Sequence, residues 1–456
     1  MAIYGSDIIV DMLKALDIEY VALNPGATFR GIHDSIVNHG GNTRPELIEC
    51  LHEEIAVAMA HGYAKVKGKP MAAITHNIVG LQHASMAIFN AWCDRVPVLV
   101  LGGTGPMDVS QRRPWIDWIH TALVQGNLVR DFVKWDDQPT TMTSAMESLL
   151  RAWAVAQTEP KGPVYICFDV ELQEAELPHG FPLPDVERYP APSTLYPDPS
   201  VLEKTANWLA EAAFPVIIAD RMGRDGDAVK TLTELAELLS IPVLDGGDHF
   251  NFASTHPLDL TGAEADILSR ADLVVGLEVD DLFGALHKVE IHTKKFVPIV
   301  SPQARIVDIS LRDQLIRSWA TDFQRLQPVD LSIAAQSGAA LSQLLAQCQT
   351  AHQGMSAQKK RGLEERKAAL EREHDELRAR WRAEAEGASK QSPVSLAWLA
   401  SVAWETIKGE DWMLANGTLQ GWARRLWDWQ KPHQFLGASG GGGLGYGLGA
   451  SLGAAL

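Results

Sequence analysis

Short apolar segments alternate with stretches of helical spacing along the first part of the chain. Residues 53–64 show the helical period clearly, because Ile55, Met59 and Tyr63 are four residues apart and therefore share one face. Glu53 falls at the opening of this predicted helix. Since strands that alternate with helices form parallel sheets, we expect ligands at the strand ends. The predicted strands lie at 20–23, 46–51, 71–75 and 96–102.

The same alternation returns further along the chain and predicts an α/β fold of three doubly wound parallel-sheet domains, of which the third is incomplete. Segment 181–199 is rich in proline and acidic residues, as in an extended linker, and 358–386 places balanced charges at helical spacing. Further strands are expected at 215–219, 242–244, 272–276, 305–309 and 412–415. We predict a first domain at 1–182, a middle domain at 195–345, a charged helical linker at 356–388 and the start of a third domain at 391–456.

Charge and cysteine content restrict the class of partner. The 456 residues carry a formal net charge of −17, and nothing in so acidic a chain would neutralise nucleic-acid phosphates or an anionic membrane. No apolar run approaches the ~20 residues that span a bilayer, and the N-terminal segment is acidic, unlike a signal peptide. Cys50, Cys93, Cys167 and Cys348 form no closely spaced pair, which argues against disulfides and structural zinc. We expect a protein of the reducing cytoplasm that acts on small molecules.

Several short motifs follow one another in the first domain. Asn24-Pro25-Gly26 comes after the first predicted strand, and His52-Glu53 opens a helix that ends in Gly62-Tyr63-Ala64. Asn90-Ala91-Trp92 then precedes Arg95-Val96-Pro97. In this order the motifs resemble the pyrimidine-binding domain of thiamine diphosphate-dependent enzymes, among them benzoylformate decarboxylase, acetolactate synthase and 2-hydroxyacyl-CoA lyase. The resemblance extends over the whole chain and implies a homodimer or homotetramer with thiamine diphosphate and Mg²⁺ as cofactors.

The resemblance gives Glu53 a role at the cofactor. It implies that Glu53 contacts the aminopyrimidine ring, and that Asn24, Pro25 and Gly26 also lie near the cofactor. The chemistry explains the residue type, because the thiazolium carbon loses its proton to a neighbouring amino group only when an acid hydrogen-bonds the far ring nitrogen. In isolation, Glu53 would also fit a solvated glutamate at a helix start, stabilised by the helix dipole. The flanking motifs favour the functional interpretation.

His76 is the second candidate for chemistry. It follows the strand at 71–75 and precedes a predicted turn at Gly80, so it could also hydrogen-bond its own loop. His76-Asn77-Ile78-Val79-Gly80 resembles the segment of benzoylformate decarboxylase that carries an acid/base histidine, whereas acetolactate synthases have Gly-Pro-Gly at this point. The resemblance therefore implies acid/base catalysis by His76.

Further residues are candidates for substrate contact. Benzoylformate decarboxylase has a serine after the glycine that matches Gly26, and the alanine at this position puts an aromatic 2-oxo acid substrate in doubt. In the loop 103–121, paired arginines beside tryptophans suit a carboxylate or phosphate, although the loop fits a dimer interface equally well. The candidates are Ala27, Thr28, Gln82, His83, Arg112, Arg113, Trp115 and His120.

The C-terminal part resembles the start of the family's diphosphate-binding domain. The turn of Asn416, Gly417 and Thr418 is expected near the cofactor diphosphate. Leu444 falls where the family places the apolar residue that bends the cofactor. The family's Mg²⁺-binding motif would follow Leu456, so we expect no metal ligand in this chain and infer a longer enzyme. The alternative is a naturally shortened relative.

Alternatives remain open both for the middle domain and for the function of the whole chain. The middle domain could be purely structural, since Gly223-Arg224-Asp225-Gly226 lacks the spacing of a phosphate loop, or it could bind FAD, ADP or CoA through Arg221 and Arg224. For the whole chain we expect a thiamine diphosphate-dependent decarboxylase, carboligase or lyase that acts on 2-oxo acids or 2-hydroxyacyl compounds. The alternative is a noncatalytic relative that keeps the fold without the cofactor.

Overall fold

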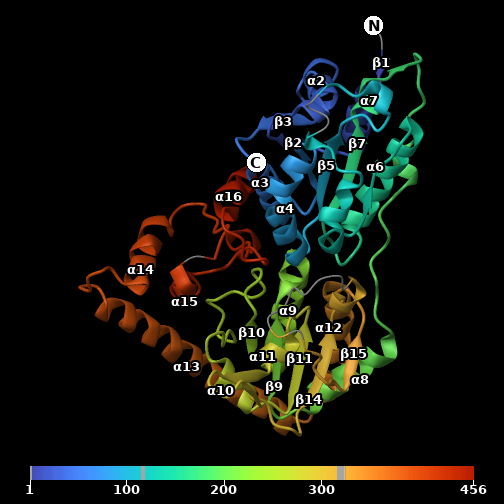
Figure 1. Ribbon diagram of the computed structural model, residues 1–456. Helices are drawn as coiled ribbons and strands as arrows, with labels where there is room; N and C mark the ends of the chain where they lie inside the picture. Colours follow the sequence, from blue (N-terminus) through green and yellow to red (C-terminus); the bar gives the residue numbers. More distant parts are fainter. Residues whose placement is uncertain (1–2, 115–118, 316–322, 324, 418) are drawn as a thin grey trace. The chain divides into compact units, whose positions relative to one another are not determined.

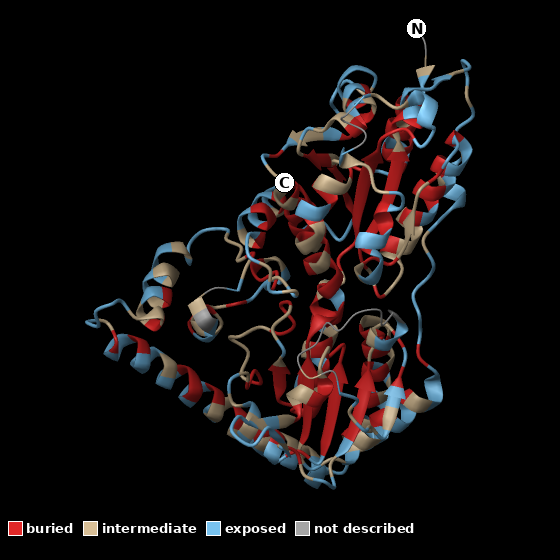
Figure 2. Cartoon of the chain, in the orientation of Figure 1, coloured by how far each residue is buried: buried red, intermediate tan, exposed pale blue. Residues whose placement is uncertain are grey.

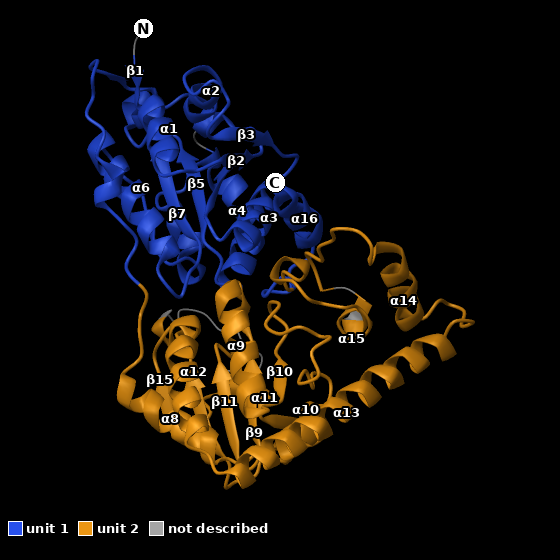
Figure 3. Ribbon diagram, turned by 180° about the vertical axis from the view of Figure 1, so that it is seen from behind, with its two compact units in different colours: residues 1–193, 315–318, 438–456 blue, residues 194–314, 319–437 orange. Residues whose placement is uncertain are grey.

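The computed structural model describes residues 3–114, 119–315, 323, 325–417 and 419–456 (Figure 1). The chain divides into two compact units (Figure 3). The first runs up to residue 193 and also contains residues 438–456, and the second contains most of residues 194–437. None of the helices in the described part of the chain combines the length and the apolar character that crossing a membrane requires.

A parallel sheet lies at the centre of the first unit, with the strand order β3-β2-β4-β5-β7-β6. Strands β4 and β5 are buried along their whole length, as expected for parallel strands covered on both faces (Figure 2). The strands span Tyr20–Leu23 (β2), Glu46–Glu49 (β3), Met71–Thr75 (β4), Val98–Thr104 (β5), Asp136–Asp137 (β6) and Val164–Asp169 (β7), and a separate antiparallel pair joins Ile3–Tyr4 (β1) to Glu176–Leu177 (β8).

Helices cover both faces of this sheet. Because side chains alternate along a strand, Ile74 packs on the face covered by α1, α2 and α6, whereas Ala73 packs on the face covered by α3 and α4. The helices span Gly5–Ala15 (α1), Arg30–Asn38 (α2), Glu53–Lys67 (α3), Ile78–Cys93 (α4), Met142–Gln157 (α6), Val170–Glu174 (α7) and Tyr446–Ala455 (α16), and the short 3₁₀ turns span Ala27–Phe29 (η1), Val109–Gln111 (η2), Gln125–Leu128 (η3), Arg130–Phe132 (η4) and Val186–Arg188 (η5).

Helix α3 begins and ends at residues suited to helix termini. His52 is its N-cap, and the Nδ1 atom of the His52 ring accepts a hydrogen bond from the backbone N–H of Glu54 at 3.2 Å. Gly68 ends the helix in the left-handed conformation, with a φ of 70°. The prediction that Glu53 opens this helix is therefore confirmed.

The second unit contains another parallel sheet, in the order β10-β9-β11-β14-β15. The two sheets with their flanking helices confirm the α/β prediction for the first and middle regions. The strands span Pro215–Ala219 (β9), Val243–Asp245 (β10), Leu273–Leu277 (β11), His287–Glu290 (β12), Lys295–Pro298 (β13), Arg305–Ile309 (β14) and Leu331–Ile333 (β15). The helices span Pro199–Glu211 (α8), Gly226–Leu239 (α9), Glu264–Ser269 (α10), Leu282–Ala285 (α11), Ser337–Gln353 (α12), Ala357–Gly387 (α13), Leu396–Ile407 (α14) and Trp422–Leu426 (α15), with 3₁₀ turns at Arg221–Arg224 (η6), Arg312–Leu315 (η7), Leu419–Gly421 (η8) and Pro432–Gln434 (η9).

The structure differs from the sequence prediction in the later part of the chain. The predicted strand at 412–415 is wrong, because Leu414 makes only an isolated bridge to Phe435. Trp412 instead packs edge-on against the rings of Trp427 and Trp429, 5.3 and 5.0 Å away. The charged segment is helical, as predicted, but α13 buries one face, including Leu370. The predicted domain boundaries stay predictions.

Helix α16 approaches α3 so closely that no side chain fits at the crossing. A Cβ atom added to Gly62 of α3 would overlap the carbonyl oxygen of Ala450, and one added to Gly453 would overlap that of Met59. Glycine at both positions therefore permits the two backbones to meet. Leu448 and Leu452 of α16 are exposed, as is Leu456, which follows the helix.

We predict that Gly62→Ala destabilises the first unit by about 1–3 kcal/mol, the usual cost of overpacking. Chemical denaturation followed by circular dichroism measures the loss. The control is Gly362→Ala in α13, where an added Cβ atom meets nothing within 4 Å, and we expect it to stabilise the helix by up to about 1 kcal/mol. Equal stability of Gly62→Ala and the wild type would contradict the close helix crossing.

Candidate functional site

The strand order of the first sheet creates a topological switch point between β2 and β4. Strand β2 pairs with β3 on one side and with β4 on the other, so the connections that leave β2 and β4 diverge. In parallel α/β sheets, ligands bind at such a switch point, outside the carboxyl ends of the strands. Here residues 24–28 follow β2, Glu53 follows β3, and His76 follows β4. The topology therefore brings the predicted site residues of the first domain to one edge.

A hydrogen bond connects the segments that follow β2 and β4. The Thr28 hydroxyl oxygen lies 2.8 Å from Nδ1 of His76 and accepts a hydrogen bond from the backbone N–H of Asn77 at 3.3 Å. Gly26 provides the space for the ring, because a Cβ atom at this position would lie 2.8 Å from Cγ of His76. Asn24 and Ala27 are half-buried beside it, and Pro25 is exposed.

Glu53 is buried next to the same histidine. Only 4% of Glu53 is exposed. A Cβ atom on Gly80 would lie 2.9 Å from Oε1 of Glu53 and 2.9 Å from Cβ of His76, so Gly80 leaves room for both side chains. The predicted turn at Gly80 is wrong, since α4 begins at Ile78 and includes Gly80 in its first turn. The glycine is needed for space and not for backbone conformation.

Two further histidines surround the Glu53 carboxylate. Nδ1 of His83 lies 3.6 Å from Oε2 of Glu53, and the rings of His52 and His83 stack 4.9 Å apart with an interplanar angle of 11°. The ligand atoms of the three residues lie within 4.8 Å of one another. A bound metal ion lies in the plane of every imidazole that coordinates it, and two stacked rings do not share such a plane. The cluster is therefore not arranged for a metal ion.

The electrostatic surroundings of His76 favour a neutral ring. Burial lowers the pKa of His76 below its ordinary value, the neighbouring His120 lowers this pKa further, and Glu53 acts in the opposite direction. The His76 and His120 rings meet edge to face, 5.3 Å apart. His76 is thus available as a neutral acid/base near neutral pH.

Asn77 carries an orphaned amide next to His76. The residue is wholly buried, and neither its side-chain oxygen nor its side-chain nitrogen has a hydrogen-bond partner among the described residues. A buried amide without partners costs free energy, so such a group fits a site that binds a polar molecule. This observation, with the buried Glu53 carboxyl, fits the aminopyrimidine ring that the sequence resemblance implies.

Only some of the predicted substrate-contact residues in α4 and in the loop after β5 lie beside His76 or Glu53. His120 reaches the His76 ring, but Nε of Arg112 donates to the carbonyl oxygen of Pro106 at 2.8 Å within the loop itself. Arg113 is half-buried, Gln82 is exposed on α4, and Trp115 lies outside the described residues. The structure therefore joins His83 and His120 to the site, while contacts of Gln82, Arg112 and Arg113 with a substrate stay predictions.

The glycine-rich segment packs on the helices that carry the site. The backbone N–H of Gly443 donates to Oδ1 of Asn90 in α4 at 3.3 Å, and a Cβ atom on Gly445 would lie 3.1 Å from Oε1 of Glu54. The Leu444 side chain is 92% exposed. Its predicted contact with the cofactor stays a prediction. Asn416 and Gly417 lie in the second unit, and Thr418 lies outside the described residues.

Comparisons with known proteins agree with this geometry. Residues 3–125 match the family model of the thiamine pyrophosphate enzyme N-terminal TPP binding domain. The chain is a relative of the thiamine pyrophosphate enzymes. The mitochondrial acetolactate synthase catalytic subunit of Saccharomyces cerevisiae is 25% identical over 472 residues, which cover 99% of this chain and 64% of the yeast protein. The sulfoacetaldehyde acetyltransferase of Castellaniella defragrans is 26% identical, over 59% of this chain and 44% of that protein.

A solved structure shares the fold of this thiamine pyrophosphate enzyme relative. Benzoylformate decarboxylase from Polynucleobacter necessarius superposes with a TM-score of 0.74 at 18% sequence identity, over 99% of this chain and 77% of that chain. The predicted family resemblance is thereby confirmed. The chain spans 64% of the length of the yeast relative and 65% of a probable acetolactate synthase from Oryza sativa.

The corresponding switch point of the second unit has a different character. There the Arg221 side chain, 4% exposed, pairs with Asp248 at 2.8 Å and with Asp280 at 2.5 Å. Burial and the charges of Asp248 and Asp280 raise the pKa of the adjacent Asp220 well above its ordinary value. Because carboxylates already surround Arg221, this position is poorly suited to a nucleotide phosphate. A structural middle region agrees better with these contacts than FAD, ADP or CoA binding through Arg221.

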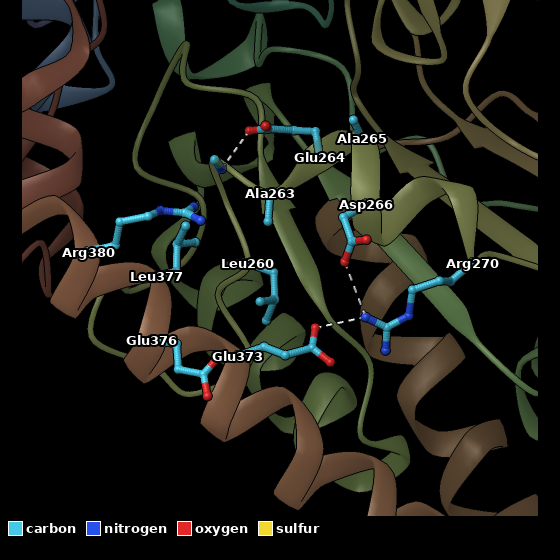
Figure 4. Close-up of a pocket in the computed structure, with 11 residues that line it drawn as sticks. Leu260, Ala263, Glu264, Ala265, Asp266, Arg270, Glu373, Glu376, Leu377 and Arg380 are labelled. Carbon is cyan, nitrogen blue, oxygen red and sulfur yellow. Dashed lines mark hydrogen bonds and ion pairs between the residues drawn. The ribbon is translucent and has the colours of Figure 1, made fainter.

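A cavity of about 500 Å³ lies between α10 and α13 in the second unit (Figure 4). Its Arg270 donates to Glu373 at 2.8 Å and to Asp266 at 3.5 Å, so this guanidinium is occupied by acidic side chains. Glu264 accepts from the backbone N–H of Gly262. The acidic side chains that line the cavity outnumber the basic ones, which disfavours an anionic ligand.

We predict that His120→Gln raises the pKa of His76 towards the ordinary histidine value, because it removes the charge that disfavours a second imidazolium nearby. A proton NMR titration of the histidine ring signals, with His76 assigned by its loss in His76→Gln, measures this shift. His39→Gln is the control, because Nε2 of His39 lies 3.0 Å from the carboxylate of Asp11 in α1. An unchanged or lower pKa in His120→Gln would exclude the interaction.

Proposed function

We propose that this chain belongs to a thiamine diphosphate-dependent enzyme that decarboxylates 2-oxo acids, or that makes or breaks a carbon–carbon bond next to a carbonyl. The observation that carries the proposal is the buried Glu53 carboxyl beside His76, at the switch point of a region that matches the TPP-binding domain family. Burial lowers the pKa of His76, and buried ionisable groups that converge at a strand edge are typical of catalytic sites.

Glu53 is placed to hydrogen-bond a ring nitrogen of the cofactor. When bound, thiamine diphosphate supplies a thiazolium carbon that becomes a nucleophile after it loses a proton. Glu53 would hydrogen-bond the aminopyrimidine nitrogen, and its burial excludes water that would compete for this bond. Gly80 leaves the space that the Glu53 carboxyl occupies beside His76. The orphaned Asn77 amide offers a donor and an acceptor to the bound molecules.

His76 favours decarboxylation within this class. Its ring, which lies beside Glu53 at the strand ends, would move a proton to or from the substrate, as implied for the matching histidine of benzoylformate decarboxylase. The second candidate is carboligation, because the relatives that cover nearly the whole chain are acetolactate synthases. The two differ in whether the acceptor is a proton or a second carbonyl compound. A noncatalytic relative is the remaining alternative, and the buried Glu53 and the orphaned Asn77 amide argue against it.

Further parts of the proposal rest on the family resemblance. They comprise Mg²⁺ with the cofactor diphosphate, contacts of Asn416, Gly417, Thr418 and Leu444 with the cofactor, and assembly as a homodimer or homotetramer. A reducing cytoplasm as the compartment is supported by the four cysteines, which are buried and form no disulfide bond within the described part of the chain.

We predict that Glu53→Gln in the full-length protein slows proton exchange at the thiazolium carbon by orders of magnitude, because an amide supplies no acidic proton to the ring nitrogen. Exchange with deuterium, quenched by acid and followed by NMR, measures the rate. The control is Glu54→Gln, which removes the next carboxylate of the same helical turn. Both variants should keep the wild-type circular dichroism spectrum. Wild-type exchange in Glu53→Gln would remove Glu53 from the mechanism.

We further predict that His76→Ala lowers turnover of a 2-oxo acid by about 10²- to 10⁴-fold, the usual contribution of a general acid/base. Cofactor affinity and exchange at the thiazolium carbon should stay near wild type, since His76 would act on the substrate. His33→Ala, on the exposed surface of α2, is the control. If turnover, affinity and exchange all fall together, His76 has a structural role only.

A further inference from the structure

The Thr28 hydroxyl lies between the backbone N–H of Asn77 and the His76 ring. These two contacts determine where the hydroxyl proton points. The backbone N–H of Asn77 is only a donor, so at 3.3 Å the Thr28 oxygen accepts that bond. The other contact of the Thr28 oxygen is His76 Nδ1 at 2.8 Å. Among the described residues these are the hydrogen-bond partners of the Thr28 hydroxyl. The hydroxyl proton is therefore available for Nδ1.

We propose that Thr28 is a positioning residue that fixes the tautomer of neutral His76, with Nδ1 as acceptor and the ring proton on Nε2. The inference deepens the proposed function, on which the catalytic part of the argument rests. Because the two ring nitrogens lie on opposite edges, the Nε2–H donor points away from Thr28. In its neutral form the half-buried His76 ring would thus present a donor, and not an acceptor, to a substrate, and transfer of the Nε2 proton would take place from the imidazolium form.

The opposite tautomer leaves a buried group unsatisfied. If Nδ1 carried the proton and donated it to Thr28, the hydroxyl proton of Thr28 would lack an acceptor among the described residues. Thr28 is only 3% exposed, so water is excluded from most of its surface. A buried donor without a partner costs free energy, and the tautomer with the proton on Nε2 avoids this cost.

Neighbouring groups prevent Thr28 from turning away. Nε2 of Gln173 donates to the Thr28 carbonyl oxygen at 2.8 Å and to that of Phe168 at 3.2 Å, which ties the backbone of Thr28 to the end of β7. A Cβ atom on Gly103 would lie 2.8 Å from the Thr28 hydroxyl oxygen, so the end of β5 also packs closely against it. The hydroxyl is held in one place before any ligand binds.

The test compares Thr28→Val, which keeps the shape and removes the hydroxyl, with Thr28→Ser, which keeps the hydroxyl. Thr205→Val is the control, because Thr205 is fully buried in the second unit and its hydroxyl donates to its own helix at the Val201 oxygen. Two quantities are measured in the full-length protein. They are the ¹⁵N chemical shifts of the His76 ring, assigned by their loss in His76→Gln, and the turnover of a 2-oxo acid.

We expect the wild type, Thr28→Ser and Thr205→Val to hold the proton on Nε2. Thr28→Val should show a mixture of tautomers and lose turnover by about 10- to 100-fold, the range seen when a partner that orients a functional histidine is removed. A single Nε2–H tautomer in Thr28→Val would overturn the inference. So would a Thr28→Ser variant as impaired as Thr28→Val, since that result indicates packing and not the hydroxyl.

The two measurements separate this inference from the proposed function. If the wild type turns over no 2-oxo acid with thiamine diphosphate, the proposed function fails, and the ¹⁵N shifts alone still decide whether Thr28 fixes the tautomer. If Thr28→Val changes the tautomer and leaves the turnover unchanged, the tautomer does not matter for catalysis and the positioning role is overturned.

Discussion

The order of strands in the first sheet is the constraint on which the site depends. Strand β2 lies between β3 and β4. The chain runs from the carboxyl end of β2 to β3 on one side and then crosses to β4 on the other side. Because the connecting helices then lie on opposite faces, the connections after β2 and β4 leave in opposite directions, which marks a topological switch point. The bond between Thr28 and His76 joins the two segments at this point, although the residues are 48 positions apart in sequence. Without the parallel pairing of β2 and β4, the two groups would not meet.

Small residues determine how closely the functional side chains approach. At Gly26 and Gly80 a Cβ atom would meet the His76 side chain, and at Gly80 it would also meet the Glu53 carboxyl. These glycines do not have a positive φ, so their role is to leave space. Gly62 has the same role at the crossing of α3 with α16. Helix α3 thus presents Glu53 at its first turn, while a later turn of the same helix is fixed by backbone contact.

The sequence predicted the elements that carry the site, but only some of its contacts. The start of α3 at Glu53 and the strands before Asn24 and His76 followed from apolar periodicity and from the positions of turn residues. The roles of Thr28 and Gly80 did not, because each depends on groups distant in sequence, and no local pattern encodes such distances. The stacking of His52 on His83 has the same origin.

Elsewhere the local signal misled for a physical reason. Residues 412–415 have a composition that fits a strand, yet Trp412 packs on the indole rings of Trp427 and Trp429, and such aromatic pairs stabilise a core. Tertiary packing overrode strand propensity, which is a weak preference in any case. The charged helix α13 shows the converse, since its charges predicted a solvated helix and its buried face includes His374 and Arg378, which hydrogen-bond to carbonyl oxygens of the second unit.

The two switch points of the chain show why topology alone does not determine function. In each sheet, two neighbouring strands have connections that leave in opposite directions. These strands are β2 and β4 in one sheet and β9 and β11 in the other. In the first, a buried carboxyl and a histidine whose pKa is lowered by burial lie beside the Asn77 amide. This amide has no hydrogen-bond partner among the described residues, so it has hydrogen-bonding capacity left for a ligand. In the second, Arg221 pairs with carboxylates on two sides, and its charge is already compensated. A ligand at the first switch point gains hydrogen bonds, whereas an anion at the second would first have to break ion pairs that are shielded from water. Because breaking a buried pair leaves an uncompensated charge, the same topology favours binding in one unit and rigidity in the other.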